Sequence, residues 1–247
     1  KDQTVIFEFE GVYARAMVYI NGDYAGGCLY GYSNFYVCAD EFLKYGEDNE
    51  ICVTANNSMQ PNSRWYSGSG IYRSVNLFTG RMLRIPVNGV RITPKSIRQG
   101  TAVAEVEVKI ENDCLQGKRI KVHTEILDPD GNTAAEDETV ITVYRGDRTG
   151  VRQRILLTAP RLWDCDSPEL YTARISLIAD GERMDCVEEK FGIREISVDP
   201  VNGFCLNGKT VNLRGTCIHH DNGIIGAATY YRAEERRCRQ LKEAGFN

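Results

Sequence analysis

Asn207 and Gly208 give the sharpest local signal in this 247-residue chain. A two-residue hairpin turn of type I′ requires positive φ at both central positions, and Asn followed by Gly meets that requirement best. Apolar residues alternate in residues 204–206 before the pair and in residues 211–213 after it. We therefore predict a β-hairpin whose second strand runs on through residues 214–216.

A helix is predicted after this hairpin, over residues 232–244, because apolar residues recur there at helical spacing and Gly245 stands where a C′ glycine belongs. The polar loop between strand and helix contains His219, His220 and Asp221. Strand, loop and helix together make one βα unit. In a (β/α)8 barrel the loop after each strand lies on the catalytic face, so these three side chains are expected near a substrate or a reaction.

The first 80 residues show short apolar strands separated by glycine-rich turns. The clearest strands are residues 4–9, 16–20 and 49–55, and the pair Asn21-Gly22 reverses the chain after the second of them. This combination predicts a β-sandwich of the jelly-roll type. About six strands are recognisable where a jelly roll needs about eight, so we expect the first part of this domain to be missing.

Residues 81–195 predict a second sandwich, which begins with a linker over residues 81–89. Alternation is clearest in residues 102–110, where every second residue is apolar. The strands are expected at residues 90–93, 101–110, 118–127, 138–144, 150–157, 171–179 and 183–191. Short strands at this spacing, with a strong turn at residues 128–131, predict an immunoglobulin-like fold of the fibronectin kind.

The pieces FCLNGK (204–209), LRG (213–215), HHD (219–221) and LKEAGFN (241–247) form a first motif. It resembles the start of the catalytic barrel of glycoside hydrolase family 2, which contains β-galactosidases, β-glucuronidases and β-mannosidases. The second, NSRWYSGSGIYR (62–73), resembles the end of the family's N-terminal sugar-binding jelly roll. The two motifs stand in the family's order with room for one domain between them.

The resemblance implies a mainly β chain of three parts: a partial jelly-roll sugar-binding domain (1–80), an immunoglobulin-like β-sandwich (81–195) and the first β/α unit of a truncated TIM barrel (196–247). It implies a fragment of a retaining β-glycosidase, of the β-galactosidase type, that acts on terminal β-linked sugars. The family's two catalytic glutamates come from later barrel strands. No catalytic residue is therefore assigned in this chain, and the fragment alone is expected to be inactive.

Two alternatives stay open beside the β-galactosidase interpretation. The first keeps the family and changes the sugar, to a β-glucuronide or a β-mannoside. The second is a non-catalytic carbohydrate-binding protein built of β-sandwiches. Against this second alternative, such a protein needs neither the loop with His219, His220 and Asp221 nor the helix that follows.

The same resemblance implies four substrate-binding residues, which are His219, His220, Asp221 and Arg64. His219 stands where relatives contact sugar hydroxyls, and a neutral imidazole can both donate and accept hydrogen bonds. Asp221 either orients a histidine or caps the turn that follows it. Arg64 lies in a loop whose aromatic residues either reach sugar or cover the edge of the sandwich.

The composition argues against several other classes of protein. A net charge of −4, without a basic stripe interleaved with aromatics, is untypical of nucleic-acid binding, and no apolar run has the length of a membrane span. The nine cysteines show no C-x-x-C spacing, so no metal site is predicted. Cys52 and Cys205 are expected in the core, and reduced buried thiols favour a cytoplasmic protein. No cofactor is assigned; use of Mg²⁺ or Na⁺, as in the family, and a homo-oligomer both stay open.

Overall fold

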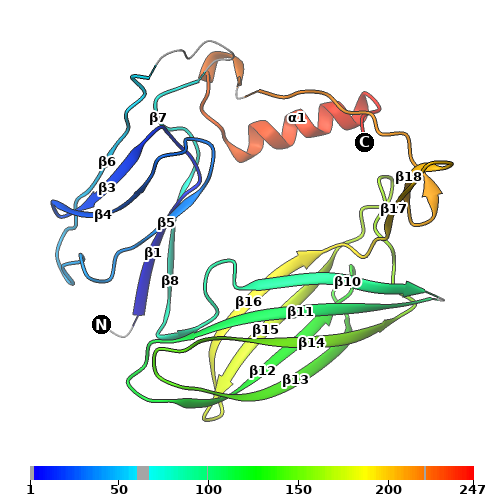
Figure 1. Ribbon diagram of the computed structural model, residues 1–247, viewed down its shortest axis with the longest axis horizontal. Helices are drawn as coiled ribbons and strands as arrows, with labels where there is room; N and C mark the ends of the chain where they lie inside the picture. The colour runs from blue at the N-terminus through cyan, green and yellow to red at the C-terminus, as the bar shows by residue number, and fades with distance from the viewer. Residues whose placement is uncertain (1–2, 60–66, 99, 220) are drawn as a thin grey trace. The chain divides into compact units, whose positions relative to one another are not determined.

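The computed structural model describes residues 3–59, 67–98, 100–219 and 221–247 (Figure 1). Almost all regular structure in these residues is β-strand, joined by one 3₁₀ turn and one α-helix. The mainly β class expected from the sequence is confirmed. The chain divides into two compact units, the first made of residues 1–79 and 213–247 and the second of residues 80–212.

The first unit contains three small sheets. In spatial order, the first sheet has β5 (Phe35–Cys38), β1 (Gln3–Phe9) and β8 (Val75–Arg81). The second has β4 (Asp23–Cys28), β3 (Ala16–Ile20) and β6 (Ile51–Thr54). The third pairs β2 (Val12–Tyr13) with β7 (Gly70–Ile71). Strand alternation places Phe9, Val18 and Val37 in a shared core, each at most 1% exposed. The ring of Phe9 stacks on that of Phe35 with 5.0 Å between centroids.

Two sequence expectations for this unit have different outcomes. Asn21 and Gly22 adopt φ values of 53° and 94°, so β3 turns back onto β4 as predicted. The expectation that Cys52 lies in the core is wrong, because its side chain is exposed. Its neighbour Val53 on β6 packs against the core instead, and successive side chains of a strand point to opposite faces.

The second unit is a sandwich of two antiparallel sheets. The first sheet has the order β10 (Val90–Arg98), β11 (Thr101–Asn112), β14 (Arg148–Thr158), with β9 (Leu83–Arg84) beside β11; the second has the order β13 (Thr133–Val143), β12 (Lys118–Leu127), β15 (Tyr171–Ala179), β16 (Glu182–Phe191). Inward side chains of both sheets, among them Val106, Ile126 and Leu177, form one core. The immunoglobulin-like sandwich is confirmed. Because β13 pairs with β12, its strand arrangement differs from that of constant-type immunoglobulin domains.

A small three-stranded antiparallel sheet ends the second unit, in the order β17 (Ile196–Asp199), β18 (Gly203–Leu206), β19 (Lys209–Thr210). Asn207 and Gly208 have φ values of 51° and 75°, which confirms the predicted turn. The predicted continuation of the second strand through residues 214–216 is wrong, since β19 ends at Thr210. A strand is defined by its ladder of bonds to a neighbour, and these residues form no such ladder within the described part of the chain.

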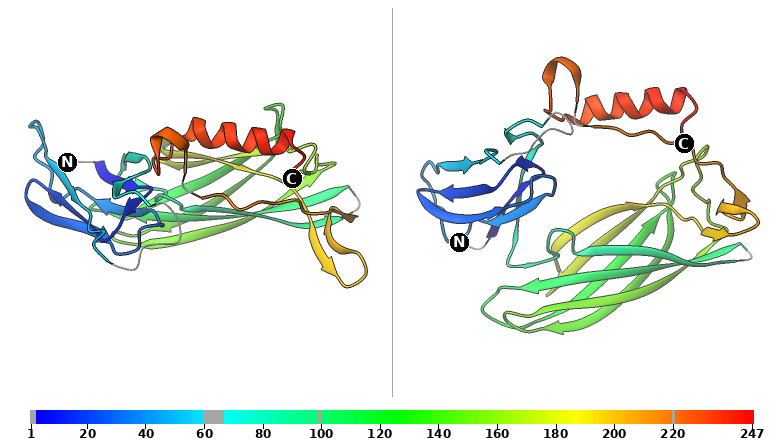
Figure 2. Two further views of the ribbon diagram at one scale, coloured as in Figure 1. Left: turned by 90° about the horizontal axis from the view of Figure 1, so that it is seen from above. Right: turned by 45° about the horizontal axis from the view of Figure 1, so that its top comes forward.

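The segment 213–247 returns to the first unit. It contains η1 (Gly223–Ile225) and α1 (Tyr231–Glu243), the latter within one residue of the predicted helix, and Gly245 has φ 90° as a C′ glycine should. Both views of Figure 2 show the stretch before η1 running beside α1. After the helix, the amide of Asn247 donates to the carbonyl oxygen of Arg214 at 3.2 Å. The chain thus comes back beside its own earlier stretch, while the first β/α unit of a TIM barrel stays a prediction.

Candidate functional site

A hollow lined by tyrosines opens on the first unit. Its volume is about 540 Å³, and its lining comes from β2, from the turn after β4 and from the stretch after β6. The lining residues are Tyr13, Ala14, Arg15, Leu29, Tyr30, Gly31, Tyr32, Asn56, Asn57 and Met59. Three aromatic rings beside an arginine and two amides are the groups that stack on sugar rings and bond to their hydroxyls.

The three tyrosines are packed against one another around Gly31. The ring centroids of Tyr13 and Tyr32 are 5.0 Å apart, and those of Tyr30 and Tyr32 are 5.8 Å apart in an edge-to-face arrangement. A Cβ on Gly31 would overlap the ring of Tyr13, so glycine is required for this cluster. Sequence reasoning missed the hollow because its tyrosines come from separate segments, and the single cue was the Tyr-Gly-Tyr run at residues 30–32.

Tyr72 joins this hollow to the C-terminal segment of the same unit. Its hydroxyl donates to the carbonyl oxygen of Gly31 at 2.8 Å, and its own carbonyl oxygen accepts from the amide of Thr229 at 2.8 Å. The ring lies close to Gly11, where a Cβ would come within 2.6 Å of it. Burial raises the pKa of the Tyr72 hydroxyl, which therefore stays protonated and serves as a donor.

The loop that carries His219 and Asp221 is held from α1 by Arg237. The Arg237 guanidinium donates to the carbonyl oxygen of Asp221 at 2.7 Å and to that of His219 at 3.3 Å, and it also contacts the side chain of Asn222. Glu234, one turn earlier on the helix, forms an ion pair with Arg237 at 3.2 Å. The backbone of the loop is thereby fixed, and the side chains of His219 and Asp221 are exposed.

The four sequence-predicted sugar contacts are described to different extents. His219 is exposed, and its imidazole's approach to a sugar stays a prediction. Asp221 accepts a hydrogen bond from the amide of Gly223 at 3.1 Å, the geometry of a turn cap. His220 and Arg64 lie outside the described residues.

In residues 3–59, 67–98, 100–219 and 221–247, no three His, Cys, Asp or Glu side chains are grouped as a metal site requires. Over the same ranges, no helix combines the length and the apolar character that crossing a bilayer demands. All nine cysteines are free thiols.

Comparison with known families gives a match over the second unit. Residues 85–194 match the model of the family described as glycosyl hydrolases family 2. This range coincides with the immunoglobulin-like sandwich from β10 to β16 together with the residues just before it.

Relatives of the whole chain carry the names of β-glycosidases. A β-galactosidase of Bacteroides ovatus, BoGH2A, is 37% identical over 97% of this chain and 28% of its own length. A β-glucuronidase of Bacteroides fragilis is 30% identical over 100% of this chain and 37% of its own length. A solved family 2 glycosyl hydrolase of Bacteroides cellulosilyticus superposes with a TM-score of 0.94 at 35% identity, over 100% of this chain and 34% of its own. This chain therefore spans about a third of the length of such relatives.

Proposed function

Because this chain belongs to glycosyl hydrolases family 2, we propose that it is the sugar-holding part of a retaining β-glycosidase that removes terminal β-galactosyl residues. The family membership supports a glycoside as substrate. The galactoside is proposed on the strength of BoGH2A, the 37%-identical relative, which is named a β-galactosidase. The nine free thiols support placing the protein in the reducing cytoplasm.

In this proposal His219 and Asp221 bind hydroxyls of the terminal sugar, together with His220 and Arg64. A neutral imidazole serves a hydroxyl as donor and acceptor at once, and a carboxylate accepts from it. Arg237 acts as a positioning residue, since it bonds to the backbone carbonyl oxygens of His219 and Asp221.

The observation that carries the proposal is the junction at Tyr72. One residue bonds through its hydroxyl to the tyrosine-lined hollow and through its carbonyl to the segment that follows the His219 loop. Two surfaces suited to sugar are therefore tied to the same residue, although they lie far apart in sequence. We propose that the hollow receives a sugar residue next to the one held by His219.

Hydrolysis with retention needs two carboxyl groups about 5–5.5 Å apart, one as nucleophile and one as acid and base. We assign this pair to the whole enzyme and assign sugar binding to the present chain. The test is the release of nitrophenol from nitrophenyl β-galactoside by the 247-residue chain. No turnover above the blank is expected, and measurable turnover by the pure chain contradicts this division of roles.

The sugar is tested on the whole enzyme with nitrophenyl β-galactoside, β-glucuronide and β-mannoside. The proposal expects the highest kcat/KM for the galactoside. It also expects His219→Ala to raise KM for that substrate, since the imidazole is assigned to the bound sugar. A higher kcat/KM for the glucuronide or the mannoside would contradict the galactoside as the substrate and would leave the family assignment unchanged. An unchanged KM in the His219→Ala enzyme would contradict the proposed contact between the His219 imidazole and the bound sugar.

A further inference from the structure

The outward face of the sheet β10-β11-β14 carries charge in a regular pattern. We call this surface the outer face; it consists of the side chains of these strands that point away from the core of the sandwich, together with Arg84 and Asp113 beside them. Its central strand supplies acids, and the flanking strands supply bases. Glu107 on β11, for example, forms an ion pair with Arg152 on β14 at 2.7 Å.

The other acids of the outer face repeat this arrangement, each meeting bases on both sides. The ion pairs are Glu105 with Lys95 and Arg154, and Glu111 and Asp113 each with Arg84 and Arg148. Cross-strand neighbours of opposite charge attract one another, so this ladder holds the face in a fixed geometry.

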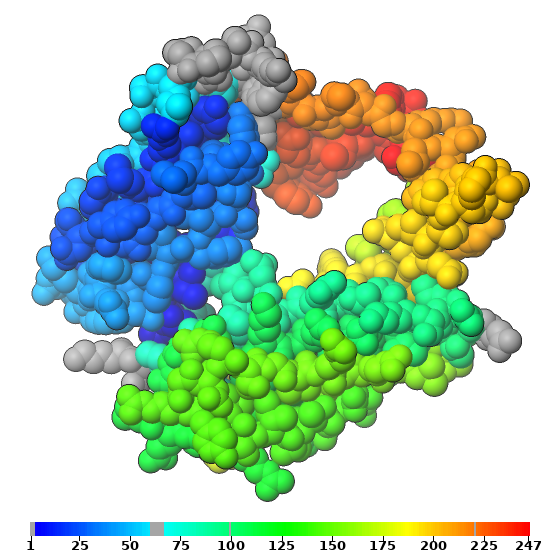
Figure 3. Space-filling model, in the orientation of Figure 1, coloured from blue at the N-terminus to red at the C-terminus, as the bar shows by residue number. Residues whose placement is uncertain are grey.

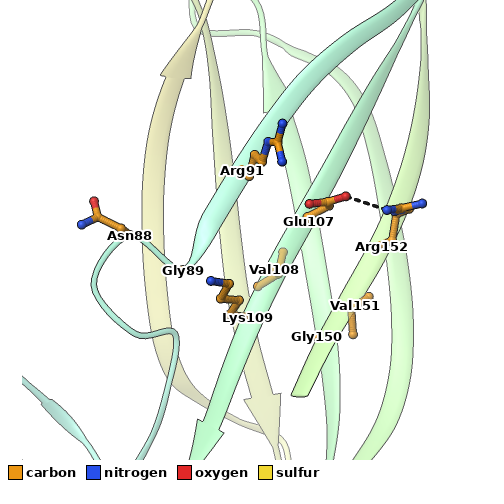
Figure 4. Close-up of a pocket in the computed structure, with 9 residues that line it drawn as sticks. All are labelled: Asn88, Gly89, Arg91, Glu107, Val108, Lys109, Gly150, Val151 and Arg152. Atoms are coloured by element: carbon orange, nitrogen blue, oxygen red, sulfur yellow. Dashed lines mark hydrogen bonds and ion pairs between the residues drawn. The ribbon is translucent and has the colours of Figure 1, made fainter. Parts of the chain in front are cut away.

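Lys109 is the exception in the ladder. It is a base on the acid-bearing strand, and the residues beside it are glycines on both sides. Gly150 faces it across β14, and the carbonyl oxygen of Gly89 accepts the amide of Lys109 at 2.7 Å. A hollow of about 440 Å³, which both glycines help to line, lies beside the lysine (Figure 4).

Two of the cations that line this hollow have no ion-pair partner among the described residues. Figure 4 shows Glu107 turned toward Arg152, with Lys109 and Arg91 outside that pair. Lys109 and Arg91 are both exposed. The hollow therefore offers two exposed cations that form no ion pair with an acid in the described chain.

The outer face as a whole is basic, although the chain carries a net charge of −4. It holds the seven bases Arg84, Arg91, Lys95, Lys109, Arg148, Arg152 and Arg154 and the four acids Glu105, Glu107, Glu111 and Asp113. Three of the arginines follow one another along β14 at every second or fourth residue, with side chains 51–62% exposed. The space-filling view shows the green atoms of this part of the chain at the surface (Figure 3).

We propose that the outer face binds an acidic polysaccharide, with one uronate carboxylate seated at Lys109 and the polymer lying along β14. Cations two residues apart on a strand are separated by roughly 7 Å, so they present a line of charge and match a linear polyanion better than a single small anion. None of the nine residues lining the hollow is aromatic, whereas binding of single-stranded nucleic acid relies on stacked bases. The choice of a glycan rests on the proposed function; the hollow and its charge do not.

The binding experiment uses the 247-residue chain and polygalacturonate, with neutral dextran of similar length as the comparison polymer. Titration calorimetry in low salt is expected to show saturable binding of polygalacturonate and none of dextran. Added salt should weaken this binding, because exposed charges are screened. Absence of binding in low salt overturns the proposal, and equal or tighter binding of a single-stranded oligonucleotide overturns the assignment to a glycan.

Two sets of variants locate the site. Lys109→Ala combined with Arg91→Ala, which removes two positive charges, should weaken polygalacturonate binding at least tenfold. Lys209→Ala is the control for Lys109→Ala alone, because it removes a single charge from the exposed strand β19, and it should leave binding within twofold. Equal effects of Lys109→Ala and Lys209→Ala on binding would show that it depends on the net charge of the chain and not on the hollow, and would overturn the proposed site. These lysines and Arg91 have no ion pairs in the described chain, so little loss of stability is expected, and thermal unfolding checks it.

Gly150→Glu tests the hollow from the opposite direction. It supplies the acid that the ladder lacks beside Lys109, and it should abolish polygalacturonate binding. The new Cβ would lie 3.3 Å from the carbonyl oxygen of Val108, a contact that a small shift of β14 relieves. Gly150→Gln fills the same space without charge and should weaken binding less. Full binding by the Gly150→Glu chain with an unchanged melting temperature contradicts the proposal, and none of these results depends on galactoside hydrolysis.

Discussion

The guanidinium of Arg237 on α1 donates a hydrogen bond of 2.7 Å to the backbone carbonyl oxygen of Asp221. This contact ties the loop of the candidate sugar site to a helix that begins ten residues after Asp221. The amide side chain of Asn222 adds a second tie, since it donates to the carbonyl oxygen of Ala228 at 3.0 Å and to Glu234 at 3.1 Å. The conformation of the loop is therefore set by the helix that follows it.

Arg237→Met should loosen this loop. The change removes donors to two backbone carbonyls, and hydrogen bonds from a charged group contribute about 1.5–3 kcal/mol each when well protected. The side chain of Arg237 is 23% exposed, so we expect a smaller effect, with the opening free energy of the loop falling by about 1–2 kcal/mol. Amide hydrogen exchange at residues 221–223 measures it. Arg236→Met is the matched control, and equal exchange in the two variants contradicts the role of Arg237.

The two sheets of the second unit are joined by a buried polar contact at Gln153. This side chain, 2% exposed on β14, accepts from the hydroxyl of Thr124 on β12 at 2.6 Å and donates to the carbonyl oxygen of Val122 at 3.1 Å. Gln153→Leu should destabilise the unit by about 1–3 kcal/mol, because it leaves buried groups without partners. Amide hydrogen exchange in β12 and β14 reports on this unit separately from the other.

A double variant separates the bond from the packing. Adding Thr124→Val to Gln153→Leu removes the second partner as well, so the loss should be smaller than in Gln153→Leu alone. Additive losses in the two single variants and the double variant would show that Thr124 and Gln153 are not coupled.

Local signals predicted most elements of this chain, because local geometry determines them. The tight turn requires positive φ at Asn207 and Gly208, residues that favour it, and alternation in β11 indicates one buried face, so both could be read directly from sequence. The strand expected after Thr210 failed for the opposite reason. A strand requires backbone hydrogen bonds to a neighbouring strand, and apolar alternation in the sequence does not show whether such a neighbour is present.

The candidate site was predictable in part. His219 and Asp221 were predicted from their place between a hairpin and a helix, and their contact with sugar stays a prediction. The structure adds Arg237 as the residue that bonds to their backbone carbonyl oxygens. The tyrosine-lined hollow could not be predicted, since Tyr13 and Tyr32 meet only after β2 and the turn after β4 have folded together. Residues that gather from separate segments leave no periodic signal in the sequence.

Tyr72→Phe should weaken the junction between the tyrosine hollow and the C-terminal segment. The variant keeps the ring, which packs against Gly11, and loses the buried hydroxyl bond to Gly31. A loss of about 0.5–1.5 kcal/mol is expected for one such bond. Thermal unfolding of the chain measures it. Tyr24→Phe removes an exposed hydroxyl from β4 and serves as the control, so an equal shift in both variants contradicts the assignment.

Acid should destabilise the second unit, because the pKa values of two of its carboxyl groups, Asp113 and Glu105, are lowered in the folded state. Burial opposes ionisation of Asp113, but hydrogen bonds from Arg84 and Arg148 outweigh it and lower the pKa below the usual 3.8. The hydrogen bond from Lys95 lowers the pKa of Glu105 below its usual 4.5. A carboxyl whose pKa is lower in the folded than in the unfolded state stabilises the fold above the unfolded value, and this stabilisation is lost as the pH falls through the folded value.

The melting temperature should therefore stay level above about pH 5 and fall from about pH 4.5 downward as these carboxylates take up protons. Asp113→Asn removes one of the titrating groups, so its melting temperature should be lower than that of the parent chain at pH 7 and the difference should shrink toward pH 3. Salt should flatten the acid limb, because the side chain of Arg148 is 51% exposed and its ion pairs are screened. A difference between the two chains that stays constant from pH 7 to pH 3 would show that the charge of Asp113 contributes nothing to stability.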